Sequence, residues 1–272
     1  MTAVRKGAFF HGIGRARSVP VMNTKNLQNR TAVVTGASKG IGAQIAVELA
    51  AAGARVVVNY RADRAGADRV VQKITEAGGS ALAVRADVAR TEQVAALFSS
   101  AREAFGTVDV LVNNAGVFEF APLGGYTEQQ YRSAADTNFW GPMLTMQALI
   151  TQPDLGPASI INVSTAGTTT LPPYASLYVA TKAALNAATV IAAKELGPRG
   201  IRVNAIAPGN SDTDGTRAMG FIGSPMADEV VAATPLGRLG APEDYGPVVV
   251  FLASDAARWI TGALIHVSGG LR

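Results

Sequence analysis

From residue 31 onward, short apolar runs rich in β-branched residues alternate with longer segments whose apolar residues recur at helical spacing. The short runs predict strands, because nearly continuous apolar sequence suits burial on both faces of a sheet. The predicted strands are Thr31–Thr35, Arg55–Asn59, Ala81–Ala86, Asp109–Asn113, Ser159–Val163, Arg202–Ala207 and Ala263–Val267. The predicted helices include Asp63–Ala77, Thr91–Phe105, Glu128–Ile150 and Tyr178–Leu196. Alternation of this kind is typical of right-handed βαβ units, so we expect an α/β fold with one doubly wound, seven-stranded parallel sheet.

The chain has neither an internal repeat nor a linker that would divide it. Residues 27–272 are therefore expected to form one domain, which is large enough to bury a core without disulfides or metals. Residues 1–26 are basic and lack sustained periodicity, so we expect a disordered basic extension. This extension either precedes a true start at Met22 or is a genuine arm or targeting segment, since it is rich in Arg and its first 21 residues contain no acid.

The segment Thr35–Gly42 joins the first predicted strand to an alanine-rich helical run that begins at Ile41. Its glycines, spaced Gly-x3-Gly-x-Gly, allow the backbone to approach a ligand closely. The free amides and the positive dipole end of the following helix favour a negative charge. The pattern predicts a pyrophosphate cradle, and the alternative is a tight strand-to-helix turn that binds nothing.

Polar and glycine residues also follow several other predicted strands. They include Asp87, Asn113, Ser164, Thr165 and Pro208-Gly209. The carboxyl ends of parallel strands share one edge of a sheet, where ligands bind in open α/β folds, so the sequence predicts one site along this edge.

Three further motifs accompany the glycine turn: Asn113-Asn114-Ala115-Gly116, Tyr178-x3-Lys182 and Pro208-Gly209. Together they resemble the short-chain dehydrogenase/reductase family from about Leu27 to Arg272. The resemblance implies a Rossmann fold and hydride transfer between a nicotinamide and a carbonyl or secondary alcohol. It is closest in kind to 3-oxoacyl reductases, although sugar and simple alcohol dehydrogenases share the same signals.

The end of the second strand bears on which nicotinamide cofactor is used. Enzymes that select NAD usually place a carboxylate there, about 20 residues beyond the glycines, to bind the adenosine ribose. In this sequence, Tyr60 resembles the position of that carboxylate, and Arg61 follows it. A second cation, Lys39, lies in the glycine turn. These cations would attract the 2′-phosphate of NADP, so we expect NADP(H) as the cofactor, with NAD(H) as the alternative. Otherwise, Lys39 and Arg61 are ordinary surface charges exposed to solvent. Asp63, the nearest acid, is expected to cap the next helix.

The resemblance implies further cofactor contacts. Asp87 and Val88 would border the adenine, Asn113 and Gly116 would shape the floor beside the cofactor, and Thr213 would hold the nicotinamide amide. Alternatively, Asp87 caps the helix near Thr91, and Asn113–Gly116 is a turn that holds neighbouring strands. The full set of expected cofactor-binding residues is Gly36, Ser38, Lys39, Gly40, Ile41, Gly42, Tyr60, Arg61, Asp87, Val88, Asn113, Ala115, Gly116, Tyr178, Lys182, Pro208, Gly209 and Thr213.

Tyr178 and Lys182 are four residues apart in a helical pattern, which places both side chains on one face. A nearby ammonium group stabilises a phenolate and lowers the pKa of tyrosine from about 10, which makes tyrosine a better general acid or base. The alternative is an amphipathic helix with a packed Tyr and a solvated Lys. By resemblance, Lys182 would also hold the nicotinamide ribose, and Asn138 would hold a water that links the lysine to solvent; otherwise Asn138 is a polar helix residue that bonds locally.

The resemblance also implies a hydroxyl that donates to the substrate carbonyl, 13 residues before the tyrosine. That position is Thr165, where the family usually has serine. Ser164 is the fallback, because it has the better spacing to Gly167. Adjacent strand residues point to opposite faces, so only one of the two can face the site, and we expect Thr165.

Composition and charge narrow the function classes. The net charge of +4 equals the four cations of residues 1–21, so the remainder is neutral, which argues against nucleic-acid binding. Two histidines, His11 and His266, leave little material for a histidine-based metal site or a Ser/His/Asp triad, and no metal is expected. The absence of cysteine fits a cytoplasmic protein, and no apolar run reaches the roughly 18 residues of a membrane span.

The glycine-punctuated segment of residues 210–239 contains Met219, Phe221 and Ile222, which predict an apolar lid over a small-molecule substrate or else core packing. The resemblance also implies a homotetramer with contacts at the C-terminal strand and its flanking helices. The rival functions are a non-catalytic regulator that senses NADPH and an NAD-dependent alcohol or sugar dehydrogenase.

Overall fold

The computed structural model describes residues 26–272, so the expected extension lies outside the described residues except for its last position. The domain contains a seven-stranded, all-parallel sheet of order β3-β2-β1-β4-β5-β6-β7. The predicted fold class is confirmed. The strands are β1 (Thr31–Val34), β2 (Arg55–Tyr60), β3 (Ser80–Arg85), β4 (Val110–Asn113), β5 (Ala158–Val163), β6 (Ile201–Pro208) and β7 (Leu264–Val267).

Strand β1 pairs with β2 on one side and with β4 on the other, so the strand order reverses there. Every residue of β1, β4 and β5 is buried, whereas the edge strands β3 and β7 are partly exposed. Burial on both faces explains why the central strands read as continuous apolar runs. A reversal of strand order opens a crevice beyond the carboxyl ends of the strands.

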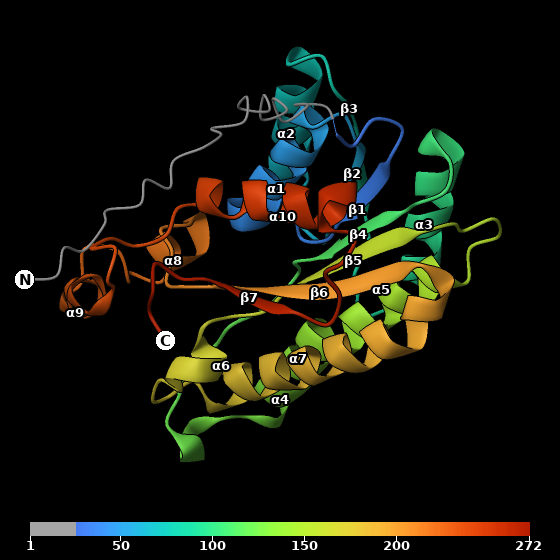
Figure 1. Cartoon of the computed structure of the whole chain (residues 1–272). Helices are drawn as coiled ribbons and strands as arrows, with labels where there is room; N and C mark the ends of the chain where they lie inside the picture. The colour runs from blue at the N-terminus through green and yellow to red at the C-terminus, as the bar shows by residue number, and fades with distance from the viewer. Residues whose placement is uncertain (1–25) are drawn as a thin grey trace, which may run out of the picture.

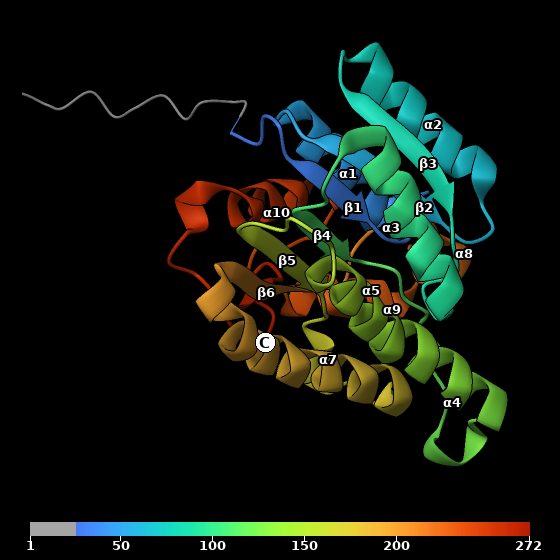
Figure 2. The same cartoon turned by 90° about the vertical axis from the view of Figure 1, so that its right-hand side faces the viewer.

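Helices cover both faces of the sheet, as Figure 1 and Figure 2 show. One face packs against α1 (Gly40–Ala51), α2 (Arg64–Glu76) and α10 (Gly246–Ala253), and the other against α3 (Thr91–Phe105), α5 (Gly141–Ile150) and α7 (Ser176–Leu196). Among the described residues, only the span Ser176–Arg199 is long and apolar enough to cross a membrane. It packs against β6 as one layer of the fold.

The single helix predicted over residues 128–150 is interrupted. The chain forms α4 (Glu128–Ala135), a π-helical segment η2 (Asp136–Trp140) and α5. The amide of Gly141 donates to the carbonyl of Asp136, five residues back. A π-helical turn inserts one residue without breaking the helical path, so the apolar periodicity did not reveal it, and such turns frequently occur at functional sites.

The segment after β6 forms two short helices, α8 (Asp214–Ala218) and α9 (Pro225–Ala233). Figure 1 places both beyond one end of the sheet. The remaining helices are short: η1 (Leu123–Gly125), α6 (Gly167–Thr170), η3 (Gly197–Arg199), η4 (Pro242–Asp244) and η5 (Asp255–Ala257).

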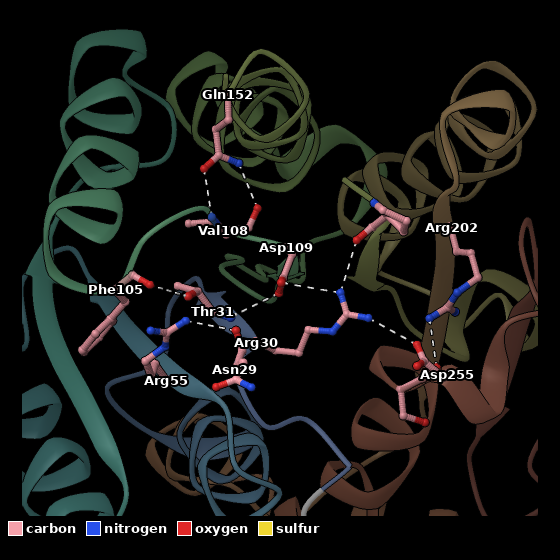
Figure 3. Close-up of polar contacts among 12 residues, drawn as sticks. Asn29, Arg30, Thr31, Arg55, Phe105, Val108, Asp109, Gln152, Arg202 and Asp255 are labelled. Atoms are coloured by element: carbon pink, nitrogen blue, oxygen red, sulfur yellow. Dashed lines mark hydrogen bonds and ion pairs between the residues drawn. The ribbon is translucent and has the colours of Figure 1, made fainter. Parts of the chain in front are cut away.

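A polar network ties the amino ends of the strands together (Figure 3). The Arg30 guanidinium lies 3.5 Å from the Asp109 carboxylate and 3.2 Å from that of Asp255, and it donates to the carbonyl of Pro157. Asp109 also accepts a hydrogen bond from the amide of Thr31. Burial raises the pKa of Asp109, while Arg30 lowers it. This end of the sheet is closed by structural contacts, which leaves the carboxyl end for ligands.

Candidate active site

The glycine turn between β1 and α1 is braced by the turn that follows β4. Gly36 has a φ of +61°, and a Cβ at this position would lie 2.8 Å from the Cα of Ala115, so only glycine fits. The Asn114 side chain donates to the carbonyls of Thr35 and Gly36, each at 3.0 Å. The two turns therefore form one rigid unit, and the Asn-Asn-Ala-Gly motif does hold neighbouring strands.

The amino end of α1 is open to an anion. Its N-cap, Lys39, makes no side-chain capping bond, and the amide of Gly40 donates instead to the carboxylate of Asp214 at 3.2 Å. That carboxylate comes from α8, at the start of the expected lid. A carboxylate at this amide is what the partial positive charge of a helix amino end favours, and the pyrophosphate cradle stays a prediction.

A cavity of about 420 Å³ lies beside this contact, between α1, α2 and α8. Lys39, Arg69, Lys73 and Arg217 are among the residues that line it. Arg217 is paired with Asp212 at 2.6 Å, and Asp214 and Glu243 also line the cavity, so its four cations exceed its three carboxylates by one charge.

At the end of β2, Tyr60 does not lie where the sequence predicts a cofactor-binding side chain. The Tyr60 side chain is 6% exposed and packs in the core, so it does not point into the edge as a cofactor-selecting side chain would. Strand alternation explains this position of the side chain. Val56, Val58 and Tyr60 share the face of the sheet that packs against α1, α2 and α10. Arg61 is exposed, and Asp63 caps α2 by accepting a bond from the amide of Gly66 at 2.9 Å, as predicted.

The residues after β3 and at the end of β4 have structural partners. Asp87 accepts a bond from the amide of Ala89 at 3.0 Å, and the N-cap of α3 is Arg90, so the alternative in which Asp87 caps that helix is wrong. The buried Asn113 amide donates to Asn162 at 2.9 Å and accepts from Thr145 at 2.6 Å. Its side chain therefore holds the sheet to α5, and only its backbone faces the edge of the sheet.

Thr213, Pro208 and Gly209 bring the end of β6 to the same edge. The Pro208 carbonyl accepts a bond from the amide of Ala166 at 2.8 Å, and a Cβ at Gly209 would lie 2.9 Å from the Cα of Ser268. Thr213 caps α8 by accepting from the amide of Thr216 at 3.2 Å. Its side chain lies next to the glycine turn, 3.7 Å from the position of a Cβ at Gly40.

Tyr178 and Lys182 lie in the first two turns of α7. Lys182 is 4% exposed, and its ammonium donates to the carbonyl of Val163 at 2.8 Å. Burial lowers the pKa of Lys182 to about 8. Burial also raises the pKa of Tyr178, while the neighbouring Thr165 hydroxyl lowers it by a smaller amount. The lowered tyrosine pKa expected from the sequence is therefore wrong for this structure, because loss of hydration outweighs the stabilising contacts.

The two candidate hydroxyls are in different surroundings. Thr165 accepts a hydrogen bond from the amide of Gly167 at 3.1 Å, and its hydroxyl is close enough to Tyr178 to lower the pKa of that phenol. Ser164 is 3% exposed, and its Oγ has no hydrogen-bond partner among residues 26–272. Thr165, the preferred residue of the sequence prediction, is the one that lies beside the tyrosine.

Asn138 lies in the π-helical segment and is completely buried. Its side chain accepts from the amide of Val117 and donates to the carbonyl of the same residue, both at 2.8 Å, and it also donates to Thr181 of α7 at 3.1 Å. A Cβ at Gly116 would lie 3.3 Å from Asn138 Oδ1 and 3.6 Å from Lys182 Nζ. The structure thus brings Asn138, Gly116 and Lys182 together and fixes the chain after β4.

Residues 36–272 match the family model described as enoyl-(acyl carrier protein) reductase. An uncharacterised oxidoreductase of Methylorubrum extorquens is 52% identical over 246 residues, which cover 90% of this chain and 99% of that protein. This chain belongs to the short-chain dehydrogenase/reductase family. The 3-oxoacyl-acyl-carrier-protein reductase FabG of Staphylococcus epidermidis is 40% identical over 244 residues, which cover 89% of this chain and 99% of that reductase.

Solved members of the short-chain dehydrogenase/reductase family have the same fold. A short-chain dehydrogenase from Burkholderia cenocepacia in complex with NADP has a TM-score of 0.85 and 35% identity, and the match covers 90% of this chain and 99% of the other. A blue fluorescent protein from a metagenomic library in complex with NADPH has a TM-score of 0.84 and 37% identity, with the same coverage of both chains. Members of this family are oxidoreductases that act on CH–OH or C=O groups with nicotinamide cofactors, so this chain is an enzyme of that class.

Two aromatic residues of this short-chain dehydrogenase/reductase were missed by sequence reasoning. The Phe118 and Phe120 rings contact the Tyr178 ring edge-on, with centroids 6.2 Å and 6.3 Å away. The sequence did contain a sign that these residues lie near the site, because both follow the Asn-Asn-Ala-Gly motif at alternate positions. Their pairing with a helix some 60 residues later depends on the fold and could not be derived locally.

Proposed function

We propose that this chain is an NADP(H)-dependent oxidoreductase that transfers hydride between the nicotinamide and a carbonyl or secondary alcohol through Thr165, Tyr178 and Lys182. The observation that carries the proposal is that Thr165, just after β5, lies beside the start of α7 and close to Tyr178, with Lys182 one helical turn further along that helix. This group lies on the edge that also carries the glycine turn. The names and bound cofactors of the relatives support the same reading.

In the reduction direction, the Thr165 and Tyr178 hydroxyls donate to the substrate carbonyl oxygen and polarise it. The raised pKa of Tyr178 keeps the phenol protonated at neutral pH, so it holds the proton that the product oxygen requires. Lys182, with a pKa of about 8, is mostly charged at pH 7 and stabilises the phenolate that forms. Bound NADP(H) supplies the hydride, or accepts it in the reverse direction.

Asn138 acts as a positioning residue in this proposal. Its contacts hold Val117 and Thr181, and so they fix the loop after β4 against the helix that carries Tyr178 and Lys182. A water between Asn138 and Lys182 remains a prediction, and the closeness of both residues to Gly116 supports it.

The residues that would hold the dinucleotide are those of the glycine turn, the loops after β3 and β4, and Thr213. The preference for NADP(H) rests on Lys39 and Arg61, which are both exposed near the end of β2. Asp63, the nearest carboxylate, is engaged in capping α2, so it is not free to bind a ribose hydroxyl. NAD(H) is the alternative, and side-by-side affinities decide between the two.

The remaining proposals concern assembly and location. We infer a homotetramer in the cytoplasm that acts on a small molecule, with residues 210–239 as a lid. Trp259 and Phe251, near the C-terminal strand, are exposed apolar residues that fit contacts between copies. Light scattering at working concentration tests the assembly, and a monomeric mass would refute it.

The test is oxidation of NADPH and NADH with a panel of ketones, oxoacyl esters and sugars. We expect turnover with NADPH, a loss of at least about 100-fold in kcat for Tyr178→Phe, and a similar loss for Thr165→Ala. Ser164→Ala is the matched control, since it removes a neighbouring hydroxyl that does not face the tyrosine. Tight NADPH binding without turnover of any substrate would favour the non-catalytic regulator instead.

A further inference from the structure

We propose that Phe118 and Phe120 form an aromatic clamp on Tyr178 that selects uncharged carbonyl compounds with a planar apolar group, such as aryl ketones. The proposal rests on the proposed function, because it concerns the substrate of the same tyrosine. It goes further by assigning the substrate class and the side chains that recognise it.

The two rings are placed to contact a substrate as well as the tyrosine. Phe118 is 38% exposed and Phe120 is 48% exposed, so each ring keeps a free surface while one edge meets Tyr178. Because both rings lie against the Tyr178 ring, their exposed parts are available to a substrate that binds beside this tyrosine. Flat apolar groups gain most from such contacts, because aromatic pairs favour edge-to-face and offset arrangements.

The segment that carries the rings is fixed at both ends before any substrate arrives. Val117 is held by two hydrogen bonds to Asn138, each 2.8 Å long. The amide of Ala121 donates to the carbonyl of Tyr174 at 2.9 Å, next to the start of α7. A preformed site loses little entropy on binding, which favours discrimination by shape.

The lid reaches the same rings. A Cβ at Gly215 of α8 would lie 2.9 Å from Cζ of Phe118, so the helix packs directly on the edge of this ring because glycine has no side chain. Phe118 therefore lies between the tyrosine and the lid. The aromatic contact continues from the reacting group to the segment expected to cover the substrate.

The charges around the tyrosine disfavour anionic substrates. Residues 114–126 and 164–178, which surround Tyr178, contain no Lys or Arg, and Glu119 lies between the two rings in sequence. In the lid, Arg217 is paired with Asp212 at 2.6 Å. A carboxylate next to the reacting carbonyl would find no cation in these segments, and the Lys182 ammonium is buried and already donates to the carbonyl of Val163, so uncharged compounds are preferred.

The test compares kcat/KM for phenyl methyl ketone, cyclohexyl methyl ketone and pyruvate with NADPH, in the wild type, Phe118→Leu and Phe120→Leu. We expect the wild type to prefer the phenyl over the cyclohexyl ketone and to use pyruvate poorly. Each leucine variant should reduce the phenyl preference by roughly three- to tenfold while retaining activity on the cyclohexyl ketone. Tyr131→Leu, which removes an exposed aromatic ring from α4, is the control and should change nothing.

An unchanged phenyl preference in both variants, or a preference for pyruvate, would overturn the clamp while leaving the reductase proposal intact. If the wild type turns over no ketone, oxoacyl ester or sugar, the proposed function fails, and the clamp is then decided by binding. In that case the affinities of phenyl methyl ketone and cyclohexyl methyl ketone are measured by titration in the presence of NADP. The proteins are the Tyr178→Phe variant and two double variants, which carry Phe118→Leu or Phe120→Leu in addition. Equal affinity for the two ketones in the Tyr178→Phe protein would refute the clamp, and a phenyl preference lost in the derivatives would support it.

Discussion

Lys182→Met is expected to abolish activity and, at the same time, to stabilise the folded protein. The wild-type ammonium is buried and has a pKa of about 8, compared with an ordinary value of 10.5. At about 1.4 kcal/mol per pH unit, holding this charge in the folded state at pH 7 costs about 3 kcal/mol. Methionine fills similar space but leaves the carbonyl of Val163 without its donor, which costs about 1 kcal/mol. The net gain is about 2 kcal/mol.

The sign of the pH dependence follows from the lowered pKa. Below pH 8 the lysine is charged in both the folded and the unfolded protein, so the folded state carries the full cost. Between about pH 8 and 10.5 the folded protein has lost this proton and the unfolded chain retains it, so wild-type stability rises relative to Lys182→Met. The advantage of the variant should therefore disappear across this range.

The measurement is urea unfolding of the cofactor-free proteins at pH 7 and pH 10, at one protein concentration, because ligands and assembly also change stability. Lys194→Met is the matched control, since Lys194 lies on the same helix but is exposed, and its stability should stay within about 0.5 kcal/mol of wild type. A Lys182→Met protein that is less stable than wild type at pH 7, or an advantage that does not change with pH, would refute the reasoning.

Two further outcomes are expected. Asp214→Asn removes the carboxylate that contacts the first turn of α1 and should tighten NADPH binding by about two- to fivefold in a fluorescence titration. Asp212→Asn removes the same charge two residues away and should not tighten binding. An equal gain in both variants would contradict the idea that the Asp214 carboxylate competes with a cofactor phosphate for the amide of Gly40. Arg30→Met leaves the partly buried Asp109 carboxylate without its nearest cation and should destabilise the protein by about 1–3 kcal/mol at pH 7 in urea unfolding. Because the pKa of Asp109 is already raised, that loss should shrink as pH falls and the carboxyl is protonated; a loss that is the same at pH 7 and pH 5 would count against the network.

Much of the fold could be predicted from local sequence, because each signal has a local physical cause. Double-sided burial requires the apolar runs of the central strands, and strand β1 and the start of α1 were predicted within one residue. The backbone at Gly36 requires glycine, and the spacing of Tyr178 and Lys182 places both on one face of a helix. These features depend on residues that are neighbours along the chain.

The sequence by itself determined the fold class and the family, and it predicted the edge of the sheet on which the proposed site lies. Tertiary structure decided which side chains reach that site and in what state. The packing of the whole chain placed the Tyr60 side chain in the core, Asp214 at the amide of Gly40, and Phe118 against Tyr178. It also raised the pKa of Tyr178, against the expectation from spacing. Contacts between distant segments and the loss of hydration on burial arise only when the whole chain has packed, so no local pattern encodes them.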